Sequence, residues 1–350
     1  MRILPIANPP NPWATTELEY IEVDGDPDGS NPGAKLHVYE DHTRSILSKN
    51  DSPDIGFTWS INPYRGCFHA CAYCYARPGH EYLSFGAGTD FDRKIVIKPK
   101  AGELLREAFE KRSWKGELIV FSGVTDCYQP LEASYKLTRA CLEVCAEYNN
   151  PFSIITKSPL IERDLDVLVE ASKRADVRVV ISIPFWDAEK ARAMEPYVAT
   201  PARRAHTIEK LAAAGIEVGV NVAPIIPGLG DEEVGDVLKA AREAGATFAG
   251  SVILRLPGPV KDVFEQRLRA ALPLRAEKVL RRIRDTRGGK LYDSRFGTRG
   301  TGEGVYADAI HALFDQTAKR LGFRTGLEFP SAKRDTFERP HGKKGQLGLF

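Results

Sequence analysis

Three cysteines that lie close together in the chain carry the clearest chemical signal in this sequence. Cys67, Cys71 and Cys74 form the pattern Cys-x3-Cys-x2-Cys. Thiolates at this density ligate zinc ions or iron–sulfur clusters. The small neighbours Gly66 and Ala70 help a loop to fold tightly around such a group. The segment is therefore predicted to bind a metal centre.

Two kinds of metal centre are compatible with this spacing. A structural zinc site needs four ligands, and His69 or His80 could supply the fourth. A [4Fe–4S] cluster held by three cysteines instead leaves one iron open to a small molecule. A third interpretation, three unrelated buried cysteines, needs no metal at all.

The same segment resembles a known family. From Gly66 to Tyr75 it reads Gly-Cys-Phe-His-Ala-Cys-Ala-Tyr-Cys-Tyr, which is similar to the cluster loop of radical S-adenosylmethionine (SAM) enzymes. The Tyr-Cys-Tyr ending is most similar to the spore photoproduct lyase-like group, sometimes called DNA repair photolyases. The resemblance extends over roughly residues 44–325.

The resemblance implies a pair of cofactors and a reaction. Cys67, Cys71 and Cys74 would hold a [4Fe–4S] cluster, and SAM would chelate the open iron through its amino and carboxylate groups. A reducing electron donor would then drive cleavage of SAM to methionine and a 5′-deoxyadenosyl radical, which abstracts hydrogen from the substrate. The protein would position the cofactors and exclude competing reactions.

The elements that must position this loop begin near residue 57, where short apolar runs alternate with amphipathic stretches. The predicted strands are Phe57–Asn62, Leu118–Gly123, Phe152–Thr156, Arg178–Ile183, Ile216–Val222 and Ser251–Arg255. The predicted helices are Ala101–Lys111, Leu131–Tyr148, Glu162–Ser172, Pro201–Ala214 and Asp231–Ala244. This alternation predicts a parallel α/β architecture. Six such units favour an incomplete (β/α)6 barrel, a partial TIM barrel, with its chemistry at the C-terminal ends of the strands.

Polar residues follow several of these strands, and the resemblance assigns roles to them. Thr125 matches a hydroxyl that helps to hold the methionine amino group of SAM, with Asp126 supporting it. Lys157 matches a lysine that pairs with the methionine carboxylate, and Ser182 matches a serine that binds the ribose. Taken singly, a Thr-Asp pair can cap a helix, a lysine can be solvated and a strand serine can pack. Their occurrence at successive strand ends favours a cofactor site.

Further residues are expected around the mouth of the barrel. Tyr73 and Tyr75 would flank the adenine or the cluster, and Tyr75 is also a candidate catalytic side chain. Asn221 and the loop Pro224–Gly230 would line the nucleoside site. Three residues that follow the fourth strand receive no role beyond a substrate contact: Glu195, Arg203 and Arg204.

Cys127 follows Asp126 directly and is therefore expected near the active-site mouth, where it is a candidate hydrogen-atom donor. The lyase that names the group uses a cysteine for this step, but Gly123 stands at the matching position here. The resemblance thus does not supply the donor, and the alternative is that Cys127 packs as a small hydrophobe. Cys141 and Cys145 share one face of a predicted helix, where they are expected to face the core rather than to bind an auxiliary cluster.

Length and composition bound the class of protein. The chain has 350 residues, of which 27% are charged and 43% hydrophobic, as in ordinary globular proteins. No apolar run approaches the ~18 residues of a membrane-spanning helix, and the N-terminus carries no secretory signal. The prediction is a cytoplasmic protein that does not contact a membrane.

The net charge of +2 hides a gradient along the chain. Residues 1–55 contain ten acids and four bases, whereas residues 255–299 contain thirteen bases and five acids. A basic helix that leads into Arg- and Gly-rich loops suits a phosphate backbone. DNA is therefore a predicted partner, and the alternative is a solvated surface.

Four segments are predicted along the chain. They are a mostly irregular N-terminal extension (1–55) with a short strand at Lys35–Tyr39, a barrel core (56–256), a basic helical region (257–330) and a flexible tail (331–350). The last five residues resemble the pentapeptide by which bacterial repair and replication proteins dock on the β sliding clamp: Gln346, Leu347, Gly348, Leu349 and Phe350. The alternative is a tail that folds back onto its own barrel.

Three functions are compatible with these observations. The first is a radical SAM enzyme that acts on DNA as a lesion-repair lyase. The second is the same radical chemistry on RNA, a peptide or a metabolite. The third is a non-enzymatic zinc or iron–sulfur module that docks on the sliding clamp.

Overall fold

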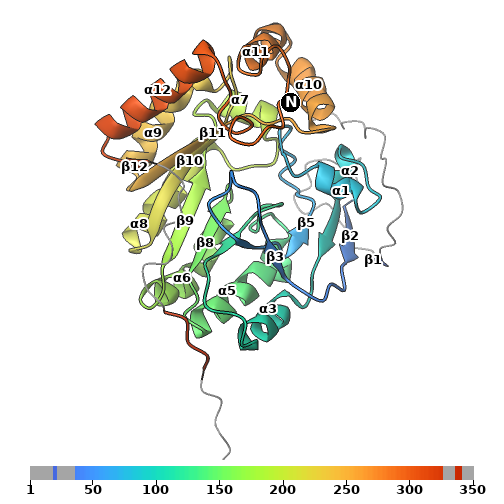
Figure 1. Ribbon diagram of the computed structural model, residues 1–350, viewed down its shortest axis with the longest axis vertical. Coiled ribbons are helices and arrows are strands. Elements are labelled where there is room, and N and C mark those ends of the chain that lie inside the picture. Colours follow the sequence, from blue (N-terminus) through green and yellow to red (C-terminus); the bar gives the residue numbers. More distant parts are fainter. Residues whose placement is uncertain (1–18, 22–35, 326–335, 341–350) are drawn as a thin grey trace, which may run out of the picture.

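The computed structural model of the protein describes residues 19–21, 36–325 and 336–340, and a large sheet runs through the molecule (Figure 1). In spatial order its strands are β12 (Arg324–Thr325), β11 (Phe248–Ile253), β10 (Glu217–Ile225), β9 (Val177–Ser182), β8 (Phe152–Thr156), β7 (Ile119–Phe121), β4 (Trp59–Ile61) and β3 (Leu47–Lys49). Neighbouring strands from β12 to β4 are parallel, and β3 is antiparallel to β4. The predicted α/β architecture with a parallel sheet is confirmed. The count of six β/α units stays a prediction, since β12 extends the parallel sheet.

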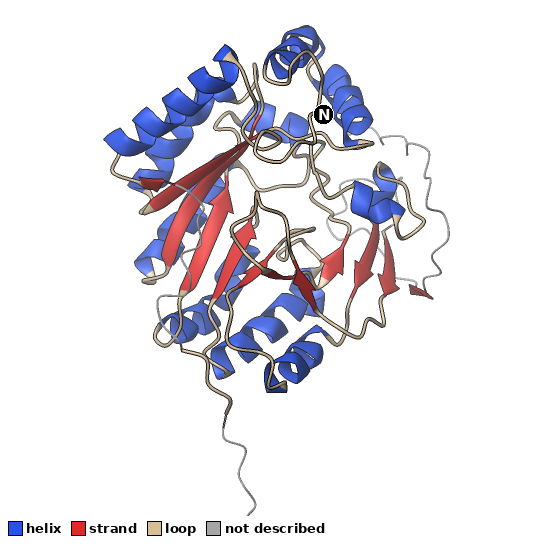
Figure 2. Cartoon of the chain, viewed as in Figure 1, coloured by secondary structure: helices blue, strands red, loops and turns tan. Residues whose placement is uncertain are grey.

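The sheet forms because its central strands are almost purely apolar. Val179 and Ile181 of β9 and Val218 and Val220 of β10 are all buried, as parallel strands covered on both faces require. The covering helices are α3 (Ala101–Glu110), α5 (Leu137–Glu147), α6 (Leu165–Ser172), α8 (Pro201–Ala213) and α9 (Val234–Glu243) (Figure 2). Because these strands are parallel, their C-terminal ends all point toward one end of the molecule, the top of Figure 1.

The helix predicted over Leu131–Tyr148 is divided in the structure. It consists of α4 (Glu132–Tyr135) and α5, which Lys136 separates. Lys136 has a φ of 54°, in the left-handed region that interrupts a right-handed helix. The Glu132 side chain then accepts a hydrogen bond from the amide of Thr138 at the start of α5 (2.9 Å). The sequence does not mark this break, because lysine is a good helix former.

The basic helical region is divided as well. Its first part forms two helices, α10 (Val260–Ala271) and α11 (Pro273–Asp285). Leu272 separates the two helices, because Pro273, the first residue of α11, disfavours helical backbone at the residue before it. Both helices lie above the C-terminal ends of the strands, and α12 (Val305–Arg320) follows and packs against α9 (Figure 1).

The last predicted strand of the barrel is displaced along the chain. It was expected at Ser251–Arg255, whereas β11 begins three residues earlier, at Phe248. The register with β10 explains the difference, since Phe248 lies opposite Gly219. The Phe248 ring fills the space that a Cβ on residue 219 would occupy. Cross-strand packing rather than β-branched composition therefore decides where this strand begins.

A second, smaller sheet lies beside the main sheet. Its order is β1 (Glu19–Ile21), β2 (His37–Glu40), β6 (Lys94–Ile97) and β5 (Tyr64–Arg65). The strand predicted at Lys35–Tyr39 thus exists as β2, and the described part of the N-terminal extension is more regular than expected. The sequence between β5 and β6 contains two short helices, α1 (Pro78–Glu81) and α2 (Thr89–Arg93).

Three short helices complete the fold at the ends of the central strands. A 3₁₀ helix, η1 (Pro159–Asp164), follows β8, α7 (Ala188–Met194) follows β9, and a second 3₁₀ helix, η2 (Asp231–Glu233), follows β10. α10 packs against α7. Within the described ranges, no helix combines the length and apolar character that a membrane span would need.

The described part of the C-terminal tail, residues 336–340, is attached to the end of the molecule opposite the strand C-termini (Figure 1). We call these residues the C-terminal strap. The Thr336 hydroxyl donates to the carbonyl oxygen of Asn149 (2.8 Å), and the Glu338 amide donates to that of Tyr148 (2.9 Å). The tail that was predicted to be flexible is therefore anchored along these five residues.

Two side chains of the strap complete the attachment. The Phe337 ring packs against the rings of Phe109 and Tyr148. The Arg339 guanidinium donates to carbonyl oxygens at and beyond the end of α3, those of Phe109, Lys111 and Trp114. The clamp-binding peptide predicted at Gln346–Phe350 lies outside the described residues.

Candidate active site

The cysteine segment forms a loop between β5 and α1, and we call residues 66–77 the cysteine loop. Gly66 has a φ of 76°, and a Cβ at this position would lie 2.9 Å from the carbonyl oxygen of Phe91, so that only glycine fits. The Cys67 amide donates to the same oxygen (2.9 Å). Cys67 and Cys71 are buried, and Cys74 is half-buried.

Arg77 holds the cysteine loop from behind, with a side chain that is completely buried. Its guanidinium donates to the carbonyl oxygen of Cys71 through Nε (3.2 Å) and Nη2 (3.0 Å). It also donates to the carbonyl oxygens of Ala87 and Gly88 and pairs with Asp92 (2.9 Å). This rigid five-donor fork fixes the backbone at the central cysteine. Arg77 could not be found from the sequence, because its partners are mainly backbone carbonyl oxygens, which every residue has and which therefore form no sequence motif.

Thr125 and Asp126, which follow β7, hold the loop from the side of the sheet. The Thr125 hydroxyl donates to the carbonyl oxygen of Gly66 (2.7 Å). Asp126 accepts hydrogen bonds from the Thr156 hydroxyl (2.6 Å) and from the Lys157 amide (2.8 Å). The two residues predicted to support SAM therefore also connect the ends of β7 and β8 to the cysteine loop.

His69 lies at the centre of a buried polar cluster within the loop. Its ring hydrogen-bonds with the Cys67 thiol and faces Asp126, 3.4 Å away. Although burial favours the neutral ring, Cys67 and Asp126 raise the pKa of His69 to about 10. The other candidate zinc ligand, His80, packs behind the loop against two phenylalanine rings, where burial lowers its pKa to about 4. His80 is thus placed among aromatic side chains rather than beside a thiol.

A buried ion pair links the cysteine loop to two strand ends. Glu195 and Arg204 are each 1% exposed and share a hydrogen bond. Glu195 also accepts a hydrogen bond from the Tyr73 hydroxyl, and its Oε1 lies 4.0 Å from Nζ of Lys157. Arg204 donates to the carbonyl oxygen of Ser182 (2.9 Å). The substrate contact predicted for Glu195 and Arg204 is wrong, because their burial leaves no surface for a substrate to touch.

Ser182 at the end of β9 lies opposite Asn221, which is four residues before the end of β10, and both are buried. Among the residues that the structure describes, Oδ1 of Asn221 has no hydrogen-bond partner. A buried amide oxygen without a partner costs free energy, so a ligand that donates a hydrogen bond is its expected partner. The two side chains are therefore suited to bind a polar small molecule such as the nucleoside part of SAM.

Tyr75 and Arg255 line the outer edge of the site. The Tyr75 ring is 50% exposed, and its hydroxyl donates to the carbonyl oxygen of Gly123 (2.8 Å). The Arg255 guanidinium, two residues after β11, lies 5.7 Å from the centroid of this ring. Its Nε is buried and has no hydrogen-bond partner in the described part of the chain. Sequence reasoning placed Arg255 only at a strand end within the basic segment.

Cys127 does not reach the mouth of the site. Its side chain is fully buried in the hydrophobic core, together with Cys141 and Cys145. The Thr138 hydroxyl donates to its carbonyl oxygen (2.6 Å), and burial raises the pKa of the Cys127 thiol well above its usual range. The packing supports the interpretation of Cys127 as a small core hydrophobe rather than as a hydrogen donor.

The three cysteines lie within eight residues of the same loop, in which the Ala70 amide donates to the carbonyl oxygen of Cys67 and the Cys74 amide to that of Cys71. Across the part of the chain that the structure describes, no three His, Cys, Asp or Glu side chains are arranged as ligands of one metal ion. The assignment of Cys67, Cys71 and Cys74 to a metal centre therefore rests on their spacing, their burial and the braced loop that carries them.

Comparison with known proteins decides the family. The model of the radical SAM superfamily matches residues 61–241. The chain belongs to the radical SAM superfamily. Members of this superfamily use a [4Fe–4S] cluster together with SAM.

Curated relatives support this placement without naming a substrate. An uncharacterized protein of Mycobacterium tuberculosis is 38% identical over 224 residues, which cover 63% of this chain and 66% of that protein. An uncharacterized protein of Methanocaldococcus jannaschii is 32% identical over 200 residues, which cover 57% of this chain and 72% of that protein. The match thus spans just under two thirds of the mycobacterial relative.

Solved structures show the same fold. Spore photoproduct lyase in complex with dinucleoside spore photoproduct has a TM-score of 0.61 and 17% identity, covering 82% of this chain and 81% of the lyase. A variant of that lyase with AdoMet and the dinucleoside bound has a TM-score of 0.56 and 19% identity, covering 79% and 78%. At this level of identity the likeness concerns the fold.

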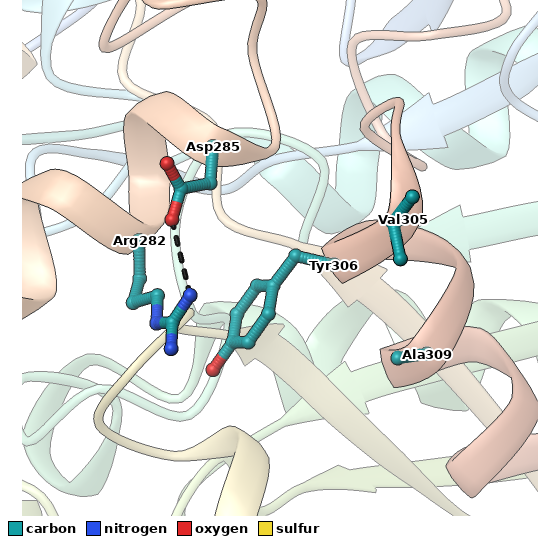
Figure 3. Close-up of a pocket in the computed structure, with 5 residues that line it drawn as sticks. All are labelled: Arg282, Asp285, Val305, Tyr306 and Ala309. Atoms are coloured by element: carbon teal, nitrogen blue, oxygen red, sulfur yellow. Dashed lines mark hydrogen bonds and ion pairs between the residues drawn. The ribbon is translucent and has the colours of Figure 1, made fainter.

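A pocket of about 380 Å³ lies apart from this site, between α11 and α12 (Figure 3). Its lining residues are Arg282, Asp285, Val305, Tyr306 and Ala309. The Arg282 guanidinium pairs with Asp285 (3.2 Å) and lies 4.5 Å from the centroid of the Tyr306 ring. None of these residues belongs to the cysteine loop or to the strand ends described above.

Proposed function

We propose that the chain is a radical SAM enzyme whose cluster is held by Cys67, Cys71 and Cys74 and whose substrate is DNA. When bound, the cluster and SAM supply a 5′-deoxyadenosyl radical that abstracts hydrogen from the substrate. Three closely spaced thiols on a braced loop suit a cluster with one open iron. The lyase that shares this fold was solved with a dinucleoside photoproduct, which supports a nucleic-acid substrate.

The residues around the loop would hold SAM through complementary contacts. Lys157 offers its ammonium group to the methionine carboxylate, since a lysine acts as a compact point charge. Its Nζ lies 5.7 Å from the ring centroid of Tyr73, which keeps it at the loop. Ser182 and the unpartnered Oδ1 of Asn221 offer polar atoms to the nucleoside. Tyr75 covers the outer edge and limits the access of water to the reacting atoms.

The DNA part of the proposal depends on which basic side chains are free. Of the thirteen bases in residues 255–299, Arg267 and Arg287 are buried and donate to backbone carbonyl oxygens. Others pair with nearby acids, namely Arg269, Arg275, Arg282, Arg295 and Arg299. Much of the positive charge in this segment is therefore structural.

Three exposed bases on α11 have no hydrogen bond or ion pair within the described ranges: Lys278, Arg281 and Arg284. They recur every three residues, so that they project from one side of the helix, and we call them the α11 basic face. α11 lies at the same end of the molecule as the strand C-termini (Figure 1). This face is the observation that carries the DNA proposal, because unpaired bases can neutralise phosphates.

The first arm of the test concerns the radical chemistry. Anaerobically reconstituted protein, given dithionite and SAM, is expected to release 5′-deoxyadenosine, and Cys71→Ala is expected to abolish the release. Persistent release from Cys71→Ala would contradict the cluster assignment. A wild-type protein that releases none would point to the non-enzymatic zinc or iron–sulfur module.

The second arm measures affinity for duplex and single-stranded DNA as a function of salt. Replacing all three residues of the α11 basic face by glutamine is expected to weaken binding about tenfold near 0.1 M salt and to reduce the salt slope by about 2–3. A matched control replaces three exposed bases between α3 and β7 that have no ion pair within the described ranges, Lys111, Arg112 and Lys115, and is expected to keep the slope.

Two outcomes of the second arm would count against DNA. A flat salt response of the wild-type protein, or equal losses in the variant and its control, would favour a peptide or metabolite substrate. Tighter binding of RNA than of DNA of the same sequence would favour RNA.

A further inference from the structure

The Glu195–Arg204 pair places a buried negative charge beside Lys157. Oε1 of Glu195 lies 4.0 Å from Nζ of Lys157, and the Glu195 side chain has no exposed surface while that of Lys157 is 18% exposed. At this separation and burial, water screens the attraction between the two charges only weakly. Left alone, Glu195 would bind the Lys157 ammonium and compete with any incoming carboxylate.

Arg204 is held in a position that removes this competition. One of its terminal nitrogens donates to Oε2 of Glu195. Its Nε and its other terminal nitrogen donate to the carbonyl oxygens of Ala199 (2.8 Å) and Ser182 (2.9 Å). Three separate groups therefore fix the guanidinium, so that it cannot leave Glu195. The Glu195–Arg204 pair has no net charge, so Glu195 does not neutralise the positive charge of Lys157.

We propose that Arg204 is a positioning residue that neutralises Glu195 and thereby keeps the Lys157 ammonium available for the carboxylate of SAM. The inference rests on the proposed function, in which Lys157 binds that carboxylate. Glu195 has the complementary task of holding the Tyr73 hydroxyl on the cysteine loop. Arg204 and Glu195 do not touch SAM and act through Lys157 and Tyr73.

The test compares SAM with decarboxylated SAM, which lacks the carboxylate. Calorimetry on the reconstituted, unreduced holoprotein measures the affinity of both ligands, and the ratio of the two affinities is the readout. Both affinities are taken for the cluster-loaded fraction of each variant, because a site without cluster lacks the iron that the SAM carboxylate would also contact. Iron content and melting temperature are recorded for each variant.

The two single variants are expected to change the ratio in opposite directions. Arg204→Gln leaves Glu195 unpaired beside Lys157, so the preference for SAM is expected to fall about tenfold. Glu195→Gln leaves Arg204 unpaired, so the preference is expected to rise about threefold. The double variant Glu195→Gln/Arg204→Gln lacks both charges and is expected to stay within about threefold of the wild type.

The sign of these changes decides the proposal. A purely structural role would lower both affinities together and leave the ratio unchanged in all three variants, which would overturn the inference. If Arg204→Gln does not fold, the other two variants still test the inference. The ratio of affinities should then rise in Glu195→Gln and return toward the wild-type value in the double variant.

Two controls separate this inference from the proposed function. Lys157→Gln is expected to reduce the preference for SAM about tenfold, and an unchanged ratio would mean that Lys157 is not the carboxylate site. If Lys157→Gln behaves as expected and the variants at 195 and 204 do not, only the present inference fails. Asp164→Asn is the matched control, because Asp164 is also a buried carboxylate that accepts hydrogen bonds from a tyrosine and an arginine. It is expected to leave the ratio unchanged.

Discussion

At the scale of single residues, Arg203 and Arg204 are neighbours in the sequence but lie in different environments. Successive residues of a helix point about 100° apart, and α8 therefore turns Arg204 into the protein while Arg203 stays 37% exposed. Arg203 pairs with Glu162, which also accepts hydrogen bonds from Lys210 and Thr207. Arg203 thus has an internal ion pair, and a substrate contact for it stays a prediction.

Glu162→Gln is expected to lower the free energy of unfolding by about 1–2 kcal/mol at neutral pH. Burial alone would raise the pKa of Glu162, but hydrogen bonds from Arg203, Lys210 and Thr207 lower it to about 2. Because the folded-state pKa is depressed, the stabilisation is complete above the unfolded-state value of 4.5 and is lost as the pH falls toward 2. The difference between wild type and variant should therefore narrow over this window.

Urea unfolding of both proteins between pH 7 and pH 3 measures this difference. Glu209→Gln on α8 is the control, since Glu209 is exposed and, among the described residues, pairs with His206 alone, and it is expected to change little at any pH. A wild-type-to-variant difference that stays constant from pH 7 to pH 3 would show that the Glu162 carboxylate is not the source of the stabilisation.

At the scale of elements, features with local patterns could be predicted from the sequence. The apolar run Phe152–Thr156 is β8 to the residue, and the cysteine spacing identified the loop that carries the site. The break at Lys136 could not be predicted, because a left-handed lysine has no local signature. Arg77 and Arg255 were missed for a related reason, since their positions depend on backbone carbonyls and an aromatic ring brought near by the fold.

Arg77→Met is expected to destabilise the cysteine loop as a unit. Three carbonyl oxygens lose their donor and Asp92 loses its ion pair, so the free energy of unfolding should fall by about 3–5 kcal/mol. The iron bound per chain after anaerobic reconstitution should fall with it, because the backbone at Cys71 is no longer fixed. Denaturant unfolding of the apoprotein and an iron assay measure the two effects.

A double variant separates two effects of Arg77→Met, the unpaired charge of Asp92 and the loss of the hydrogen bonds from Arg77 to the cysteine loop. Burial raises the pKa of Asp92 to about 6 even beside Arg77, and Asp92→Asn in the Arg77→Met background removes this strained carboxylate. It is expected to recover part of the stability but not the iron content. Full iron content in Arg77→Met would mean that the loop keeps its geometry without the guanidinium.

At the scale of the whole molecule, the two ends of the main sheet differ in character. The C-terminal ends of the strands face α10 and α11, and the α11 basic face lies there (Figure 1). The opposite end carries the C-terminal strap, which connects α3 to α5 through backbone and ring contacts. The net charge of +2 therefore hides a local group of unpaired bases on α11.

Deletion of residues 336–350 is expected to lower the free energy of unfolding by about 2–3 kcal/mol. Without these residues, Phe337 no longer packs on two aromatic rings and Arg339 no longer donates to the carbonyl groups at and beyond the end of α3. Deletion of residues 341–350 alone is expected to leave that free energy unchanged. Both deletions should bind SAM like the full chain, because the strap lies at the end opposite the strand C-termini. Chemical unfolding and calorimetry measure these effects. Destabilisation by the shorter deletion would instead support a tail that folds back onto its own barrel.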